Sequence, residues 1–207
     1  MEAGNTKYIS GYCLIEDNRI VLNGTEIMHA PGLSFADFAK QVYRDAGILY
    51  PKFFKMDNLS KLAFLASEFT LKGHNGENEA PADTALVFAN SSSSLDTDVK
   101  YQESINDKQH YYPSPAVFVY TLPNICLGEI SIRHHLYTEN SFFIFAAFNP
   151  DFFANYADIL LNTNKAGHVL CGWTEFFKDK YRAFVYLVSD TGNIKHTTDT
   201  IKKLYNR

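Results

Sequence analysis

Cysteine and histidine are the residues of this 207-residue chain best suited to nucleophilic or metal chemistry, and it has three of the first and seven of the second. Cys13, Cys126 and Cys171 are far apart, and each lies among apolar neighbours. A disulfide framework or a metal cage needs closely spaced pairs, and a reactive thiolate needs an exposed, electropositive setting. The spacing therefore predicts three buried free thiols, which favours a cytoplasmic protein.

The remaining sequence predicts no catalytic constellation, cofactor site or metal site. His134 and His135 are adjacent, so on a helix they point about 100° apart and cannot serve one site. Neither a Gly-x-Ser-x-Gly elbow nor a glycine-rich phosphate loop occurs. The segment most similar to a nucleophile elbow, 145–150, reads Phe-Ala-Ala-Phe-Asn-Pro and contains no nucleophile.

Composition narrows the class of protein further. The chain has 19 Lys and Arg against 23 Asp and Glu, a net charge of −4, which argues against a general nucleic-acid binder. No apolar run approaches the roughly 20 residues of a membrane span, and no secretory signal pattern precedes the first strand. Aromatic residues make up 15% and charged residues 20%. We therefore expect a single domain over residues 1–207 with more apolar surface than one small core needs.

Hydrophobic patterning predicts alternating strands and helices. Strands are expected at 7–15, 84–90, 141–148, 165–173 and 181–188, with a hairpin at 19–29 around Asn23-Gly24. Helices are expected at 34–46, from 57 to Gly73, at 123–136, from Asn149-Pro150 onward, and at 196–206. The runs 84–90 and 141–148 are continuously apolar, which is typical of strands buried on both faces. The pattern indicates an α/β domain with a mostly parallel layered sheet.

Three segments, in this order, resemble the β-ketoacyl synthase family. They are Phe54–Ala63 with its Lys-Met-Asp helix start, Ala85–Ser92 with its serine-rich strand end, and Ser114–His134. The third segment carries the SPxxF, TxPN and GxISI patterns that in the family precede the strand delivering the catalytic cysteine. The resemblance covers nearly the whole chain but only the N-terminal half of the family's two-part, thiolase-like fold.

Two departures from the family pattern bear on activity. The family's nucleophilic cysteine aligns with Ala147, whose methyl group cannot accept an acyl chain from a thioester. The second half of the fold, which supplies the family's catalytic histidines, has no counterpart here. The resemblance therefore implies a chain length factor, not an enzyme by itself, and is strongest to the half-length factors of aryl polyene or flexirubin-type type II polyketide systems.

The resemblance also implies sites. The end of an acyl tunnel would be lined by Phe118, Thr121, Leu122 and Ile125. Phe118, Thr121 and Ile125 recur at i, i+3 and i+7, so they share one helix face if the helix begins this early. An ordinary core stripe would show the same spacing.

A half-fold without its second half should leave an apolar face uncovered for a partner. The expected partner interface comprises Arg133, Tyr137, Phe142, Phe143, Phe145 and Phe148. The alternative is that these phenylalanines fill the domain's own core. The implied partners are a full-length ketosynthase, in a heterodimer, and an acyl carrier protein reached through the complex. A self-associating scaffold that binds acyl carrier protein or an acyl chain, with no ketosynthase partner, is the competing function.

Overall fold

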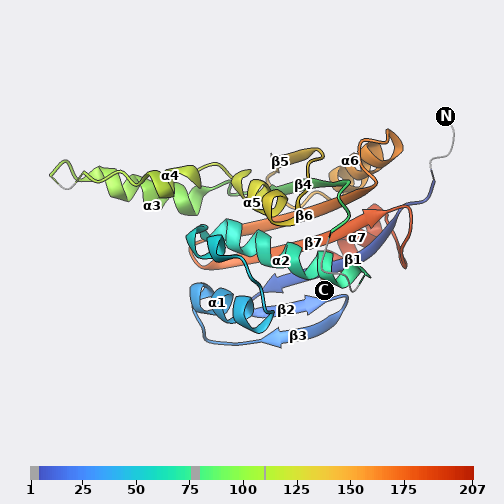
Figure 1. Cartoon of the computed structure of the whole chain (residues 1–207), viewed down its shortest axis with the longest axis horizontal. Coiled ribbons are helices and arrows are strands. Elements are labelled where there is room, and N and C mark those ends of the chain that lie inside the picture. The colour runs from blue at the N-terminus through green and yellow to red at the C-terminus, as the bar shows by residue number, and fades with distance from the viewer. Residues whose placement is uncertain (1–4, 76–79, 110) are drawn as a thin grey trace.

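The computed structural model describes residues 5–75, 80–109 and 111–207 and contains one sheet flanked by helices (Figure 1). The strands are β1 (Tyr8–Glu16), β2 (Arg19–Leu22), β3 (Thr25–His29), β4 (Thr84–Asn90), β5 (Asn140–Ile144), β6 (His168–Phe177), β7 (Lys180–Ser189) and β8 (Ile194–Lys195). The helices are α1 (Phe35–Asp45), the 3-10 helix η1 (Pro51–Lys55), α2 (Asn58–Asn75), α3 (Leu95–Asn106), α4 (Pro115–Val119), α5 (Ile125–His134), α6 (Pro150–Asn162) and α7 (Thr198–Tyr205).

The strand order is β3-β2-β1-β7-β6-β4-β5, with β8 paired to β1. β4 is parallel to both β5 and β6, whereas β7 is antiparallel to β6 and β1. Consequently β1, β4, β5 and β6 run in one direction and β7 runs against them. The expected α/β fold is confirmed, but parallel pairing is confined to β6-β4-β5. Lys178 and Asp179 form a two-residue turn at positive φ between β6 and β7, and so short a link permits only an antiparallel pair.

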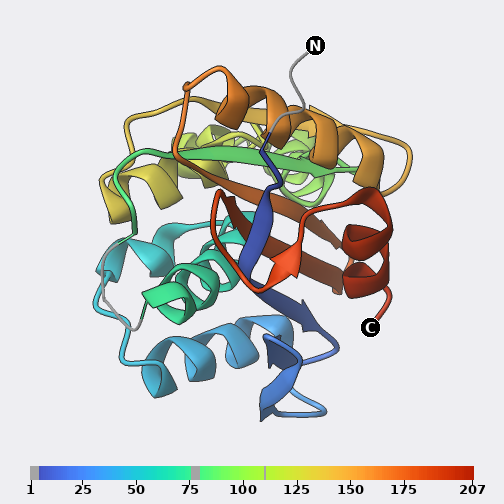
Figure 2. The same ribbon diagram turned by 90° about the vertical axis from the view of Figure 1, so that its right-hand side faces the viewer.

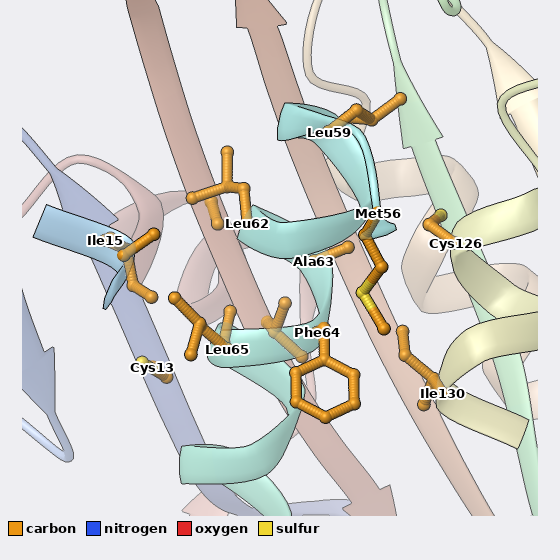
Figure 3. Packing of buried hydrophobic residues seen from close by; sticks show 14 of the residues in the cluster. Cys13, Ile15, Met56, Leu59, Leu62, Ala63, Phe64, Leu65, Cys126 and Ile130 are labelled. Atoms are coloured by element: carbon orange, nitrogen blue, oxygen red, sulfur yellow. The ribbon is translucent and has the colours of Figure 1, made fainter. Parts of the chain in front are cut away.

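One face of the sheet is covered by α1, α2 and α5. α2 and α5 meet through a continuous apolar cluster, in which Met56, Phe64, Cys126 and Ile130 face one another (Figure 3). Asp57 begins α2 by accepting a hydrogen bond from the Ser60 backbone N–H at 2.9 Å, which satisfies a helix-terminal donor. In the Lys-Met-Asp segment, Asp57 therefore caps α2 while Met56 packs in the core between α2 and α5.

The other face of the sheet is covered by α6 and α7 (Figure 2). Its core is aromatic: the Phe148 ring stacks on Tyr205 with centroids 4.1 Å apart and meets Trp173 and Phe184 edge-on. Phe184 and Tyr186 of β7 are fully buried beneath them. The C-terminal helix closes this face of the sheet within the same chain, so any apolar surface left for a partner lies elsewhere.

Two further helices lie where the sequence predicts irregular structure. α3 and α4 form an arm, residues 95–109 and 111–122, that extends away from the sheet (Figure 1). Ser114 caps α4 by accepting a hydrogen bond from the Val117 backbone N–H at 3.3 Å. The helix expected at 123–136 begins at Ile125, and α2 continues past Gly73 to Asn75. None of the described helices has the length and apolarity needed to cross a bilayer.

The two edges of the sheet differ. β3 is mostly exposed, carries Glu26 and His29, and is bent by an irregular register opposite β2. Within the described residues no strand pairs with the outer edge of β5, which ends at the half-exposed Ile144. Charge and irregularity discourage strand addition at an edge, so only β5 offers a receptive one.

Candidate functional site

The position of the expected nucleophile is the loop between β5 and α6. Ala147 is exposed there, and Asn149 caps α6 by accepting a hydrogen bond from the Phe152 backbone N–H at 3.0 Å. An open hollow of about 490 Å³ lies beside it, between the start of α6 and α7. It is lined by Ala147, Phe148, Pro150, Asp151, Thr198, Asp199, Lys202, Tyr205 and Asn206.

The residues that line this hollow include neither a cysteine nor a histidine. The Thr198 hydroxyl donates to the Asp151 carboxylate at 2.9 Å, which orients it as a structural link between α7 and α6. Covalent catalysis needs a nucleophile within hydrogen-bond reach of a positioned base, itself held by a third group. The hollow therefore offers a binding surface of mixed charge.

The three cysteine thiols are poor candidates for a nucleophile. Cys13, Cys126 and Cys171 are free and buried. Burial raises the pKa of all three, that of Cys171 to about 12. Since the thiolate is the nucleophile, none of them is reactive at neutral pH, and the prediction of buried free cysteines is confirmed.

The histidine pair separates as expected. His134 is buried with Nε2 3.0 Å from the Glu68 carboxylate, whereas His135 ends α5 at a φ of 55° and is exposed. Arg133 Nε contacts the same carboxylate at 2.7 Å, and Lys72 Nζ does so at 3.3 Å. Burial alone would raise the pKa of Glu68, but the hydrogen bonds from His134 and Arg133 outweigh it and lower the pKa to about 2. This cluster holds α5 on α2.

Among the residues that the structure describes, no group of three or more His, Cys, Asp or Glu side chains is arranged to hold a metal ion. Glu175 illustrates how the acidic side chains are used instead. Its carboxylate accepts hydrogen bonds from the backbone N–H groups of Ser91 and Ser92 at 2.7 and 3.2 Å, and from both hydroxyls. The serine run is therefore a loop fixed to β6.

The four residues expected to line a tunnel do not share one helix face. Phe118 belongs to α4 and Ile125 begins α5, while Thr121 and Leu122 lie in the turn between the two helices. Pro123 explains the break, because the residue before a proline is disfavoured in the helical region. Phe118 and Leu122 are 56% and 58% exposed, so these side chains are not a core stripe.

The six residues expected at the partner interface also separate. Tyr137 is 85% exposed, and Arg133 is partly buried against Glu68 with its guanidinium 5.8 Å from the centre of the Tyr50 ring. Phe142 packs on the α2 and α5 side of the sheet. The remaining three, Phe143, Phe145 and Phe148, pack on the aromatic core under α6.

Further apolar side chains are exposed on the two elements that flank Tyr137. Ile132 of α5 and Ile144 of β5 are 57% and 50% exposed. A groove of about 460 Å³ runs between these elements, lined by Gly128, Ser131, Ile132, His135, Leu136, Tyr137 and Asn140. We call Ile132, Tyr137 and Ile144 the open edge. The signal for Ile132 was its place on α5 opposite the buried Cys126 and Ile130.

No protein-family model matches the chain, and neither does any curated protein. Solved structures do match. The chain is 19% identical to a chain of the ishigamide ketosynthase/chain length factor, with a TM-score of 0.65, covering 89% of this chain and 62% of that one. The fold is ketosynthase-like.

Two further matches agree with that fold. The complex of the ketosynthase ApeO with its chain length factor ApeC from Xenorhabdus doucetiae gives a TM-score of 0.56 at 16% identity, covering 91% of this chain and 80% of that chain. A β-ketoacyl synthase from Burkholderia phymatum STM815 gives 0.59 at 10% identity, covering 97% and 61%. The chain thus spans about three fifths of the first-named chain and of the synthase.

Proposed function

We propose that this chain is a non-catalytic partner of a ketosynthase, acting as a chain length factor in polyene-type polyketide biosynthesis of the aryl polyene or flexirubin class. The observation that carries the proposal is the ketosynthase-like fold with Ala147 exposed after β5, where the family resemblance puts the nucleophile. A methyl group cannot form a thioester. The partner's own cysteine would therefore perform the condensation on acyl carrier protein thioesters, and this chain would shape the space around it.

The open edge is the proposed docking surface for the ketosynthase. Ile132 and Tyr137 line the groove beside α5 and the start of β5, and Ile144 is exposed at the other end of β5. Exposed apolar side chains on neighbouring elements mark interaction sites. The unpaired outer edge of β5 adds backbone donors and acceptors for a strand of the partner. Carrier protein would reach this chain through the complex. We place that complex in the cytoplasm, which suits three free thiols.

The arm is the proposed wall of the acyl tunnel. Phe118 and Leu122 present large apolar side chains to the outside of this chain, beside the partly buried Thr121 and Ile125. In a complex, their bulk would set where the growing chain must stop. Phe118→Ala is expected to lengthen the product or to broaden its length distribution, which mass spectrometry of the released acyl chains would show.

Co-expression with a ketosynthase encoded beside it tests the pairing. We expect a stable 1:1 complex that Ile144→Arg abolishes, because a buried unpaired charge at the edge strand is costly. Ile27→Arg is the matched control, since Ile27 is 45% exposed on β3 at the opposite edge. Separate elution of the two wild-type proteins, with a ketosynthase fully active alone, would refute the proposal.

A second candidate function is a self-associating scaffold that binds acyl carrier protein or an acyl chain. The feature that favours it is the same unpaired β5 edge, which a second copy of the chain can also cover. Light scattering of the purified chain distinguishes the two. A monodisperse homodimer that binds carrier protein and ignores the ketosynthase favours the scaffold, whereas insoluble protein rescued by the ketosynthase favours the heterodimer.

A further inference from the structure

Few residues of the arm are buried, and one side chain stands out among them. In the described part of the stretch from Asp98 to Ile125, Tyr120 is the only buried residue, at 8% exposure. Its neighbours Val119 and Leu122 are both exposed. Tyr120 therefore reaches inward, whereas Phe118, Val119 and Leu122 around it are exposed.

The Tyr120 hydroxyl ends at a buried acid. It donates a hydrogen bond to Glu129 Oε1 at 3.0 Å. The other oxygen of that carboxylate, Oε2, lies 3.0 Å from Lys52 Nζ and accepts from the Tyr50 hydroxyl at 3.4 Å. Glu129 is 4% exposed. We call Tyr50, Lys52, Tyr120 and Glu129 the Glu129 cluster, and it joins the end of α4 to α5 and η1.

The hydrogen bond to the buried Glu129 carboxylate attaches Tyr120 strongly to the body of the protein. Burial, then the hydrogen bond to Glu129, raises the pKa of Tyr120, so its hydroxyl stays protonated and remains a donor. Hydrogen bonds to an ionised carboxylate are shorter and stronger than those between neutral groups. Leaving a buried carboxylate oxygen without its donor is costly.

A second contact fixes the residue that follows. The Ser94 hydroxyl, at the start of α3, donates to the Thr121 carbonyl oxygen at 2.6 Å. Ser94 is itself 3% exposed. The two contacts therefore hold residues 120 and 121, which lie between Phe118 and Leu122 in the chain.

We infer that the Tyr120–Glu129 hydrogen bond is the positioning contact that sets where Phe118 and Leu122 stand, and hence the length specificity of the tunnel. The claim about the length specificity of the tunnel rests on the proposed function. The claim about the positions of Phe118 and Leu122 does not. Tyr120 and Glu129 touch no acyl chain in this scheme. They act through the side chains that do.

Tyr120→Phe tests the contact, because it removes only the hydroxyl and keeps the ring that fills the space. We expect backbone amide hydrogen exchange in 116–122 of the isolated chain to become about tenfold faster, the change for losing one charge-assisted hydrogen bond. Exchange in β4 and α2 should be unaltered. Tyr112→Phe is the matched control, since Tyr112 is 75% exposed on the same arm. Unchanged exchange in Tyr120→Phe would overturn the inference.

The second measurement is the product. In the complex with the ketosynthase, Tyr120→Phe should broaden the length distribution while the amount of complex and the total condensation rate stay at wild-type values. The wild-type distribution from an intact Tyr120→Phe complex would overturn the specificity role. A failure of the wild-type chain to bind any ketosynthase would instead refute the proposed function, and the exchange experiment would still decide the positioning contact.

Discussion

Apolar side chains are buried on the aromatic face under α6 and α7, whereas they are exposed at the open edge on α5 and β5. On the aromatic face, Phe148 and Tyr205 stack over a fully buried Phe184. At the open edge, Ile132 and Tyr137 are more than half exposed with a groove between their elements. Both regions are rich in apolar side chains, but only the first has a helix of the same chain to cover it.

The contrast shows where the high aromatic content goes. Much of it is divided between the cores on the two faces of the sheet, and α7 is held on its face by Arg182, whose guanidinium lies 4.1 Å from the centre of the Tyr205 ring. More than half of the exposed large apolar side chains in the described chain fall instead within 111–144. A partner is therefore expected at the arm and the open edge.

Truncating one aromatic side chain in each region gives the strongest test of this difference in packing. Phe184→Ala should lower the free energy of unfolding by about 4 kcal/mol, because it opens a cavity in a fully packed core. Tyr137→Ala, at 85% exposure, should change it by less than about 0.5 kcal/mol. Urea denaturation followed by circular dichroism measures both. Equal losses would show that the two regions are packed alike.

The next largest effect concerns the base of the open edge, where Glu68 of α2 holds α5. Glu68→Gln should cost about 3 kcal/mol, because it leaves Arg133 and His134 without their buried counter-charge. Since the pKa of Glu68 falls from 4.5 to about 2 on folding, its contribution is present above pH 4.5 and is lost as the pH falls towards 2.

Thermal melts at a series of pH values test that sign. The wild-type melting temperature should drop between pH 4.5 and 2 more steeply than that of Glu68→Gln. Asp37→Asn serves as control, because the exposed Asp37 carboxylate pairs only with Ser34 and Lys40 at the surface. Parallel pH curves for wild type and Glu68→Gln would contradict the assignment.

A smaller effect is expected at the open edge itself. Ile132→Ala should weaken binding to the ketosynthase about tenfold, as for a moderate interface contact, while leaving the stability of the free chain unchanged. Isothermal titration calorimetry measures the affinity. If stability falls and affinity does not, Ile132 belongs to the core and the open edge is smaller than described.

The smallest perturbation probes the loop that separates the two regions. Ala147→Cys places a thiol at an exposed position near the start of α6, where thiolates are favoured. Its alkylation by iodoacetamide should exceed that of buried Cys171, whose pKa is about 12, by about a thousandfold. Stability should not change. Slow labelling of Ala147→Cys would mean that the loop is covered.

Local signals predicted the fold better than they predicted the surfaces. Asn23 and Gly24 both adopt positive φ, 51° and 87°, as the hairpin prediction requires. The arm was missed because α3 has only Thr97 buried, so no apolar stripe marks it as a helix. The closed aromatic face was missed because it depends on α7 returning across the sheet, a long-range contact that no local pattern encodes.

Residue types likewise predicted chemistry better than placement. The burial of Cys126 and the separation of His134 from His135 followed from spacing alone. The tunnel residues were placed on one helix because spacing cannot reveal that the chain turns between Phe118 and Ile125. The strand that carries Phe142, Phe143 and Phe145 was expected at the interface. That Ile144 is its exposed residue depends on which strand lies at the edge of the sheet, and the sequence does not show that.

The unequal edges of the sheet limit how many molecules can join it. A sheet that is receptive at both ends can polymerise, since each added copy exposes a new receptive end. Here β3 carries Glu26 and His29 and an irregular register, so growth at that end is discouraged. Among the strands that the structure describes, β5 therefore offers the receptive edge. Strand addition there is expected to stop after one added chain, because the opposite edge does not accept another.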